Sequence, residues 1–111
     1  MGGIFIKNFT IDYENRMIST DTRIIYLSQK EFDLFVLFCQ NPRVEFTKEE
    51  IYQKLWTSDN QDIKTVSVHV WKLRKKLRYS ENSIGIILNK YGAGYKFLPA
   101  RGPKKVSVET S

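Results

Sequence analysis

The stretch DIKTVSVHVWKLRKKLRYSENSIGIILNKYGAGYKF, residues 62–97, decides the fold of this chain. Its first half repeats apolar residues at intervals of three and four, which is the spacing of one face of an α-helix. Its second half places a turn with two glycines, Tyr91–Gly94, between two short runs of strand-forming residues, a pattern typical of a β-hairpin. The stretch therefore predicts a helix that Asp62 caps and that runs to about Arg78, followed by a hairpin over residues 86–97.

The predicted helix has two chemically different faces. One face is an apolar stripe that consists of Val66, Val70, Leu73 and Leu77. At about 100° per residue, the opposite side carries Lys64, Val68, Trp71 and Lys75, with Lys72 and Arg78 on its flanks. We expect the stripe to be buried and the basic, aromatic side, with Trp71, to face outward.

Positive charge is concentrated in the same helix. The chain has 111 residues and a formal net charge of +6 at pH 7. Residues 62–78 hold six basic side chains and one acidic one, whereas residues 1–61 hold seven basic and nine acidic ones. This asymmetry favours a polyanionic partner such as nucleic acid, and the alternative is a basic helix face that is merely solvated.

The residues before this helix predict strands and then two more helices. Alternating apolar residues at Phe9–Tyr13 and turn signals at 14–16 and 21–22 are typical of an antiparallel meander. Two capping boxes follow, Ser28–Glu31 and Thr47–Glu50, and each predicts the start of a helix. Strands, three helices and a terminal hairpin, in that order, describe an α+β fold of the winged helix-turn-helix type.

The domain is expected to span residues 1–98. From residue 99 onward the chain is poor in apolar side chains, so residues 99–111 are expected to form a disordered tail. The polar residues 57–61 predict a loop between the second and third helices.

Composition argues against several functional classes. The sequence shows no apolar run near twenty residues and no signal peptide, so we expect no membrane span and a cytoplasmic protein. A single cysteine, Cys39, and a single histidine, His69, make neither a zinc site nor a convincing catalytic pair. We expect no enzyme activity, no metal and no cofactor.

Four motifs in register resemble one known family, the winged-helix effector domains of OmpR/PhoB-type response regulators. Leu27-Ser28 with Glu31, Leu34 and Leu37 resembles the family's opening of helix one, and Phe46-Thr47 with Glu50, Ile51, Leu55 and Trp56 resembles its second helix. Residues 65–76 (TVSVHVWKLRKK) are similar to its third helix, and residues 91–97 (YGAGYKF) to its wing signature. The match covers about residues 4–98.

This resemblance implies an architecture and a set of partners. It implies a four-stranded antiparallel sheet before the three helices, a third helix in the major groove of double-stranded DNA and a wing at the minor groove. It further implies head-to-tail dimers on direct repeats, a receiver domain that usually precedes the effector domain, and contact with RNA polymerase through the loop at residues 57–61.

The resemblance also implies DNA contacts at individual positions. The DNA-facing positions of the third helix correspond to Lys64, Thr65, Ser67, Val68, Trp71, Lys72 and Arg74. Trp56 matches a tryptophan at the phosphate backbone, and Tyr95 matches the wing tyrosine. The chain departs from the family at Trp71, where arginine is common, and at Tyr91, where the family often has the minor-groove arginine and this chain has Lys90 beside it.

Side-chain chemistry assigns roles within this set. Lys64, Arg74, Lys75 and Lys90 can neutralise phosphates, and the hydroxyl of Thr65 can donate to one. Lys72 can donate to guanine, and Val68 can contact a thymine methyl group. The indole of Trp71 can pack on the sugar–phosphate backbone. Two alternatives remain open: a winged-helix module that docks a protein through Trp71, and an RNA-binding winged helix. Trp56 has the alternative of packing in the core.

Overall fold

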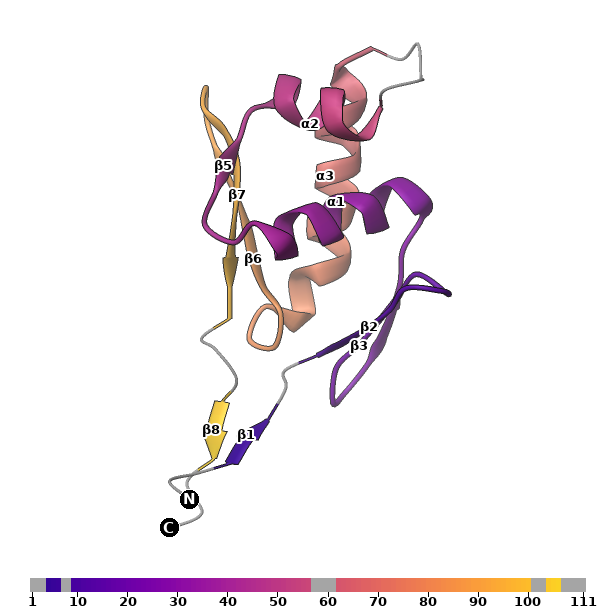
Figure 1. Cartoon of the computed structure of the whole chain (residues 1–111), viewed down its shortest axis with the longest axis vertical. Coiled ribbons are helices and arrows are strands. Elements are labelled where there is room, and N and C mark those ends of the chain that lie inside the picture. Colours follow the sequence, from indigo (N-terminus) through magenta and orange to yellow (C-terminus); the bar gives the residue numbers. More distant parts are fainter. Residues whose placement is uncertain (1–3, 7–8, 57–61, 101–103, 107–111) are drawn as a thin grey trace.

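The computed structural model describes residues 4–6, 9–56, 62–100 and 104–106. Three helices lie between two three-stranded sheets, and a separate two-stranded ribbon contains both ends of the described chain (Figure 1). The three helices and the hairpin appear in the predicted order. The fold is therefore α+β, as the sequence predicts.

The first two helices begin at the predicted capping boxes. Helix α1 (Gln29–Gln40) follows Ser28, and α2 (Lys48–Leu55) follows Thr47. In the second box the amide of Glu50 donates to the hydroxyl of Thr47 at 3.0 Å, and the amide of Thr47 donates to the Glu50 carboxylate at 2.8 Å. Each box satisfies two backbone N–H groups that the helix itself leaves without partners.

Helix α3 (Lys64–Leu77) is the helix predicted by the apolar stripe. The N-cap residue of α3 is Ile63, which has no side-chain cap bond, but the carboxylate of Asp62 just before it accepts the amide of Lys64 at 2.9 Å. The predicted Asp62 therefore satisfies one N–H of the first turn. A short 3₁₀ helix, η1 (Arg78–Ser80), continues from its end. All four stripe residues are at most 2% exposed, and they attach α3 to α1 and α2.

The N-terminal sheet has three strands rather than the expected four. Its strands β2 (Thr10–Asp12), β3 (Met17–Ser19) and β4 (Ile24–Tyr26) form the predicted antiparallel meander. Strand β1 (Ile4–Ile6) does not join them but pairs with β8 (Lys104–Val106). A local pattern predicts that a segment is extended but not which strand it pairs with, and here the partner is 100 residues away in the chain.

Two parts of the expected tail belong to strands. Strand β7 (Gly94–Pro99) includes Pro99, and Lys104–Val106 is the strand that pairs with β1. The remaining residues of the predicted tail beyond Ala100 lie outside the described residues.

The predicted hairpin is part of a second three-stranded sheet, the wing sheet. Strand β6 (Gly85–Lys90) pairs with β7, and the two-residue strand β5 (Glu45–Phe46) pairs with the other edge of β7. The sequence does not predict strand β5, because a strand of two residues shows no periodicity. Gly94 has a φ of 122°, and a Cβ there would lie 2.0 Å from the carbonyl oxygen of Phe46, so β5 can pass this close only because residue 94 is glycine.

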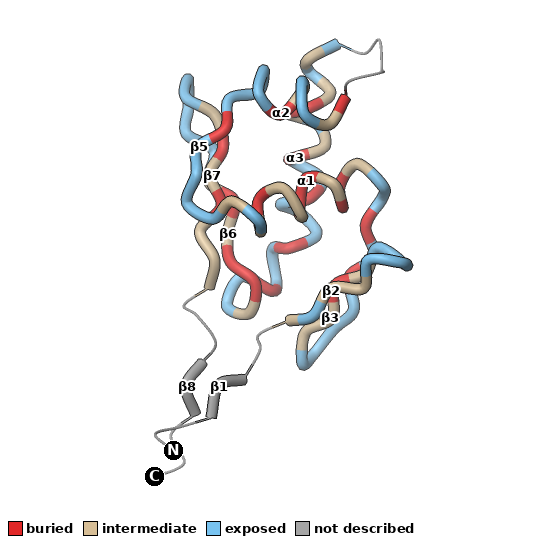
Figure 2. The backbone as a smooth tube through the Cα atoms, viewed as in Figure 1, coloured by how far each residue is buried: buried red, intermediate tan, exposed pale blue. Residues whose placement is uncertain are grey.

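One apolar core joins these elements. Figure 2 shows the buried positions on the helix sides and strands that face the interior. Phe35 and Phe38 of α1 are fully buried, Phe35 lies edge-on to Phe97 of the wing sheet, and Phe38 lies edge-on to Phe46. The core therefore fixes the wing sheet and α3 relative to the same helix, α1.

Candidate nucleic-acid interface

The outer face of α3 is exposed along its length. Trp71 is 58% exposed and Val68 is 48% exposed. Five basic side chains on this helix are also exposed, namely Lys64, Lys72, Arg74, Lys75 and Lys76, and the last of these lies on the flank that bonds to Glu31 of α1. Since the opposite stripe is buried, α3 presents a basic and aromatic surface that is supported from behind by the core.

Trp71 and Lys75 form a pair at the centre of this surface. The ammonium group of Lys75 lies 4.9 Å from the centroid of the Trp71 ring, within the range of a cation–π interaction. This contact restrains both side chains without burying either. The prediction that Trp71 faces outward is confirmed.

A hollow of about 750 Å³ separates α3 from the wing. Trp71 and Arg74 line it from α3, Lys90 and Tyr91 line it from the wing, and the first turn of α2 closes a third side. Asn89 and the α2 residues Lys48 and Glu49 also line it, and no sequence motif indicates them. The capping box at Thr47 predicts where α2 begins, but no local signal in the sequence places that turn beside α3 and the wing.

The wing tip carries one free aromatic side chain and one tethered cation. Tyr91 is fully exposed, at 101% of its reference surface. The ammonium group of Lys90 lies 3.9 Å from a carboxylate oxygen of Glu45, a long and exposed ion pair that contributes little to stability. Both side chains remain accessible beside the hollow.

Ser67 and Tyr95, two of the predicted DNA contacts, hydrogen-bond to each other. The phenol of Tyr95 donates to the hydroxyl of Ser67 at 3.3 Å, and Tyr95 is only 6% exposed. This bond joins the wing sheet directly to α3. The structure therefore gives Tyr95 a role in positioning the wing.

Trp56 is buried, so the packing alternative is the one observed. It is 1% exposed, stacks on Tyr52 with an interplanar angle of 5°, and lies edge-on to His69 at 5.3 Å. The ammonium group of Lys30 lies over its ring and donates to the carbonyl of Leu55.

His69 and Thr65 occupy the flank of α3 that faces Trp56. Nδ1 of His69 lies 2.8 Å from the carbonyl oxygen of Thr65 and 3.2 Å from its hydroxyl. The imidazole therefore has local hydrogen-bond partners, and Thr65 is half-buried.

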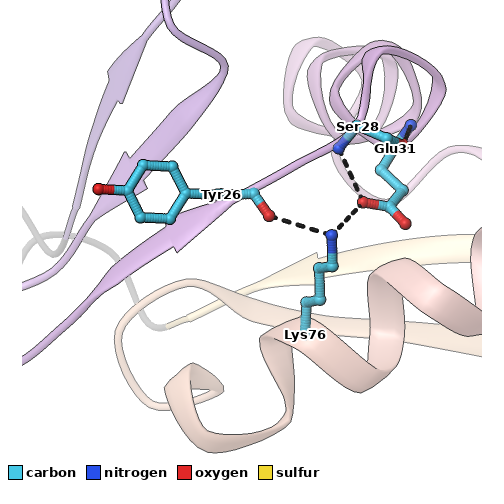
Figure 3. A network of polar contacts seen from close by, with 4 residues as sticks. All are labelled: Tyr26, Ser28, Glu31 and Lys76. Atoms are coloured by element: carbon cyan, nitrogen blue, oxygen red, sulfur yellow. Dashed lines mark hydrogen bonds and ion pairs between the residues drawn. The ribbon is translucent and has the colours of Figure 1, made fainter.

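Lys76 is a basic residue that the structure removes from the outer face. Its ammonium group donates to the carboxylate of Glu31 at 2.6 Å and to the carbonyl of Tyr26 at 3.0 Å (Figure 3). The same carboxylate oxygen accepts the amide of Ser28 at 2.9 Å. Burial by itself raises the pKa of Glu31, but the hydrogen bonds from Lys76 and Ser28 outweigh it and hold that pKa below its ordinary value of 4.5.

Other chemistry has little support in the described residues. Burial raises the pKa of the Cys39 thiol to about 12, which disfavours the nucleophilic thiolate. Within residues 9–56 and 62–100 no three His, Cys, Asp or Glu side chains converge as metal ligands. None of the helices described is both long and apolar enough to cross a membrane.

Comparison with known proteins places these features in a family. The family described as "Transcriptional regulatory protein, C terminal" matches residues 21–97. A transcriptional regulatory protein of Bacillus subtilis, YcbL, is 34% identical over 96 residues, which cover 84% of this chain and 42% of that protein. The regulator SrrA of Staphylococcus aureus is 31% identical, with 85% and 40% covered. The chain thus spans about two fifths of the length of these relatives.

Solved structures show the same fold. The DNA-binding domain of the response regulator AdeR, in complex with an intercistronic region, is 26% identical with a TM-score of 0.68, and the match covers 84% of this chain and 95% of that one. The DNA-binding domain of Bacillus subtilis CssR is 27% identical with a TM-score of 0.69, over 81% and 99%. The DNA-binding domain of Escherichia coli CadC, at 18% identity and a TM-score of 0.74 over 96% and 97%, shares the fold.

Proposed function

Because this chain belongs to the family of C-terminal domains of transcriptional regulatory proteins, and within it to the OmpR/PhoB-type response-regulator DNA-binding domains, we propose that it recognises specific sequences in double-stranded DNA. This family is one of DNA-binding domains, not of enzymes. The observation that carries the proposal is the outer face of α3, where exposed cations surround Trp71 while the opposite stripe is buried.

The shape of the surface supports a docking geometry. An α-helix fits the major groove, which is about 12 Å wide, and the exposed side of α3 is free along its length. Tyr91 and Lys90 stand across the hollow from Trp71, so a duplex that holds α3 in the major groove brings the wing tip to the adjacent minor groove. The spacing of α3 and wing is set by the core and by the Ser67–Tyr95 bond.

The side chains divide into two groups by their chemistry. Lys64, Arg74, Lys75 and Lys90 neutralise phosphates, which gives affinity without sequence preference. Lys72 donates to guanine O6 or N7 and contributes to sequence preference. Trp71 and Tyr91 add apolar contacts that a charge cannot supply.

The assembly on DNA is part of the same proposal. Two copies bind head-to-tail on direct repeats, and a phosphorylatable receiver domain regulates them in the full-length protein. The proposed contact with RNA polymerase involves residues 57–61, which lie outside the described residues. The setting is cytoplasmic, as for a regulator that meets chromosomal DNA.

The test is a selection of bound duplexes from a random pool, followed by affinity measurements at several salt concentrations. We expect Lys72→Ala to relax the sequence preference, and Lys75→Ala to weaken binding to all sequences alike and to flatten the salt dependence. Tyr26→Ala, on the exposed N-terminal sheet, is the matched control and leaves both unchanged.

The outcomes separate the alternatives. A pool that yields no preferred duplex contradicts the proposal. A protein-docking module is favoured if the affinity for DNA does not depend on salt and Trp71→Ala loses binding to a protein partner. A preference for RNA over DNA of the same sequence favours an RNA-binding module. Identical profiles for Lys72→Ala and Lys75→Ala contradict the division of roles.

A further inference from the structure

The outer face of α3 lacks several of the side-chain types that recognise bases. The helix sequence is KTVSVHVWKLRKKL, and it contains no Asn, Gln, Asp or Glu. It therefore lacks the amide side chains that pair with adenine and the carboxylates that accept from cytosine. Of its two hydroxyl residues, Ser67 bonds to Tyr95 and Thr65 contacts His69. The cations Lys64, Lys72, Arg74 and Lys75 and the exposed apolar surface remain for the base edges.

The apolar surface is a compact pair of side chains. Val68 and Trp71 are three positions apart, which places them side by side on a helix. Val68 lies almost opposite the buried stripe and is 48% exposed, while Trp71 is 58% exposed. Both side chains project from the part of α3 that approaches deepest into a groove when the helix docks by its outer face.

The pair is held in place before any ligand binds. The Lys75 ammonium group over the Trp71 ring restrains the indole, and Val68 has a single preferred rotamer in a helix. Ordering these side chains on binding therefore costs little entropy. A rigid apolar surface flanked by Lys64, Lys72 and Lys75 suits an apolar group that lies close to phosphates.

One group in the major groove has this character. Thymine carries a C5-methyl group there, and it is the only apolar substituent among the four ordinary bases. We propose that Val68 and Trp71 recognise thymine methyl groups in the half-site, next to a guanine that accepts from Lys72. This inference rests on the proposed function and names the base class that the same helix selects.

The test removes the methyl groups one at a time. Each thymine of the selected duplex is replaced by deoxyuridine, which keeps the base pair and deletes only the methyl group. Burial of one methyl group predicts a loss of affinity of about three- to fivefold at the contacted positions. Val68→Ala and Trp71→Ala should each bind more weakly and lose the sensitivity to deoxyuridine at the thymine that the missing side chain contacts.

Separate control measurements test whether the variants fold and whether the effect is specific to the two side chains. Both residues are exposed, so the variants should keep the thermal stability of the parent, and Tyr26→Ala, an equally exposed aromatic side chain at 65%, should keep the full deoxyuridine sensitivity. Its ring points away from Lys76 in Figure 3, so the substitution leaves the backbone contact intact.

Three results overturn the inference while leaving sequence-specific DNA binding in place. These are a selected half-site without a required thymine, equal affinity for every deoxyuridine duplex, and deoxyuridine sensitivity that persists unchanged in both variants. A selection that yields no preferred duplex contradicts the proposed function itself, so the two failures are distinguishable.

Discussion

Lys75 and Lys76 are neighbours in the sequence and carry the same charge, yet they belong to two different regions of the molecule. Lys75 lies on the outer face of α3, over the exposed ring of Trp71. Lys76 lies on the flank that faces α1 and β4, where it bonds to Glu31 and to the backbone of Tyr26. A basic segment therefore overstates the charge available to a partner, because part of it holds the domain together.

The largest loss of stability is expected from a substitution in the buried stripe of α3, which supports both regions. Leu73 is fully buried in the stripe of α3, so Leu73→Ala leaves a cavity and should lower the free energy of unfolding by about 2–5 kcal/mol. Denaturant titration measures this. Trp71→Ala should change stability by less than about 0.5 kcal/mol, and a similar loss in both variants would contradict the distinction between the two faces.

The next effect separates the two lysines. Lys76→Met should lower the free energy of unfolding by about 1–2 kcal/mol, because the buried carboxylate of Glu31 loses its cation. The loss stays this small because water screens the charge of the partly exposed Lys76. Lys75→Met should cost less than about 0.5 kcal/mol in the same titration but weaken binding to DNA. Equal stability losses in the two variants would contradict the distinction between the two regions.

The pH dependence of stability gives a second test of the Lys76 region. The folded-state pKa of Glu31 lies below its ordinary value of 4.5, so its contribution is present above pH 4.5 and is lost as the pH falls through the folded-state pKa. We expect Glu31→Gln to show a smaller loss of stability between pH 5 and acid than the parent protein. Asp12, whose pKa is also lowered by its hydrogen bonds with Asn15, accounts for acid sensitivity that remains, and an unchanged acid profile would contradict the assignment.

The smallest effect concerns the joint between α3 and the wing. Tyr95→Phe removes one hydrogen bond of 3.3 Å to Ser67 and should lower the free energy of unfolding by about 0.5–1 kcal/mol. Since the ring itself remains packed, DNA affinity should fall no more than a few-fold. A loss of affinity as large as that of Lys75→Ala would support the predicted contact of Tyr95 with DNA. Binding measurements beside thermal melts decide this.

Sequence patterns predicted the elements more completely than their partners. The stripe, both capping boxes and the hairpin each depend on contacts within a few residues, so they are visible in the sequence. Pairing of β1 with β8 and of β5 with β7 joins segments far apart in the chain, and nothing in either segment specifies the other. The four-stranded sheet was therefore wrong while its meander was confirmed.

The candidate site shows the same division. The outward direction of Trp71 follows from its angle to the stripe and was confirmed. The burial of Trp56 at the end of α2, and of Tyr95 in the wing, depends on which residues of other elements close over them. Lys76 could not be separated from Lys75 by composition, since only the positions of Glu31 and Tyr26 in space distinguish them.

The sequence by itself determined that three capped or striped helices precede a glycine-tipped hairpin, and that positive charge gathers on the third helix, because these properties are local and periodic. Only the tertiary structure decided which of those charges remain free, which aromatic side chains are covered, and how the wing stands beside α3. The physical reason is that burial and hydrogen bonding at each of these positions come from residues distant in the chain, through a core that no single segment contains.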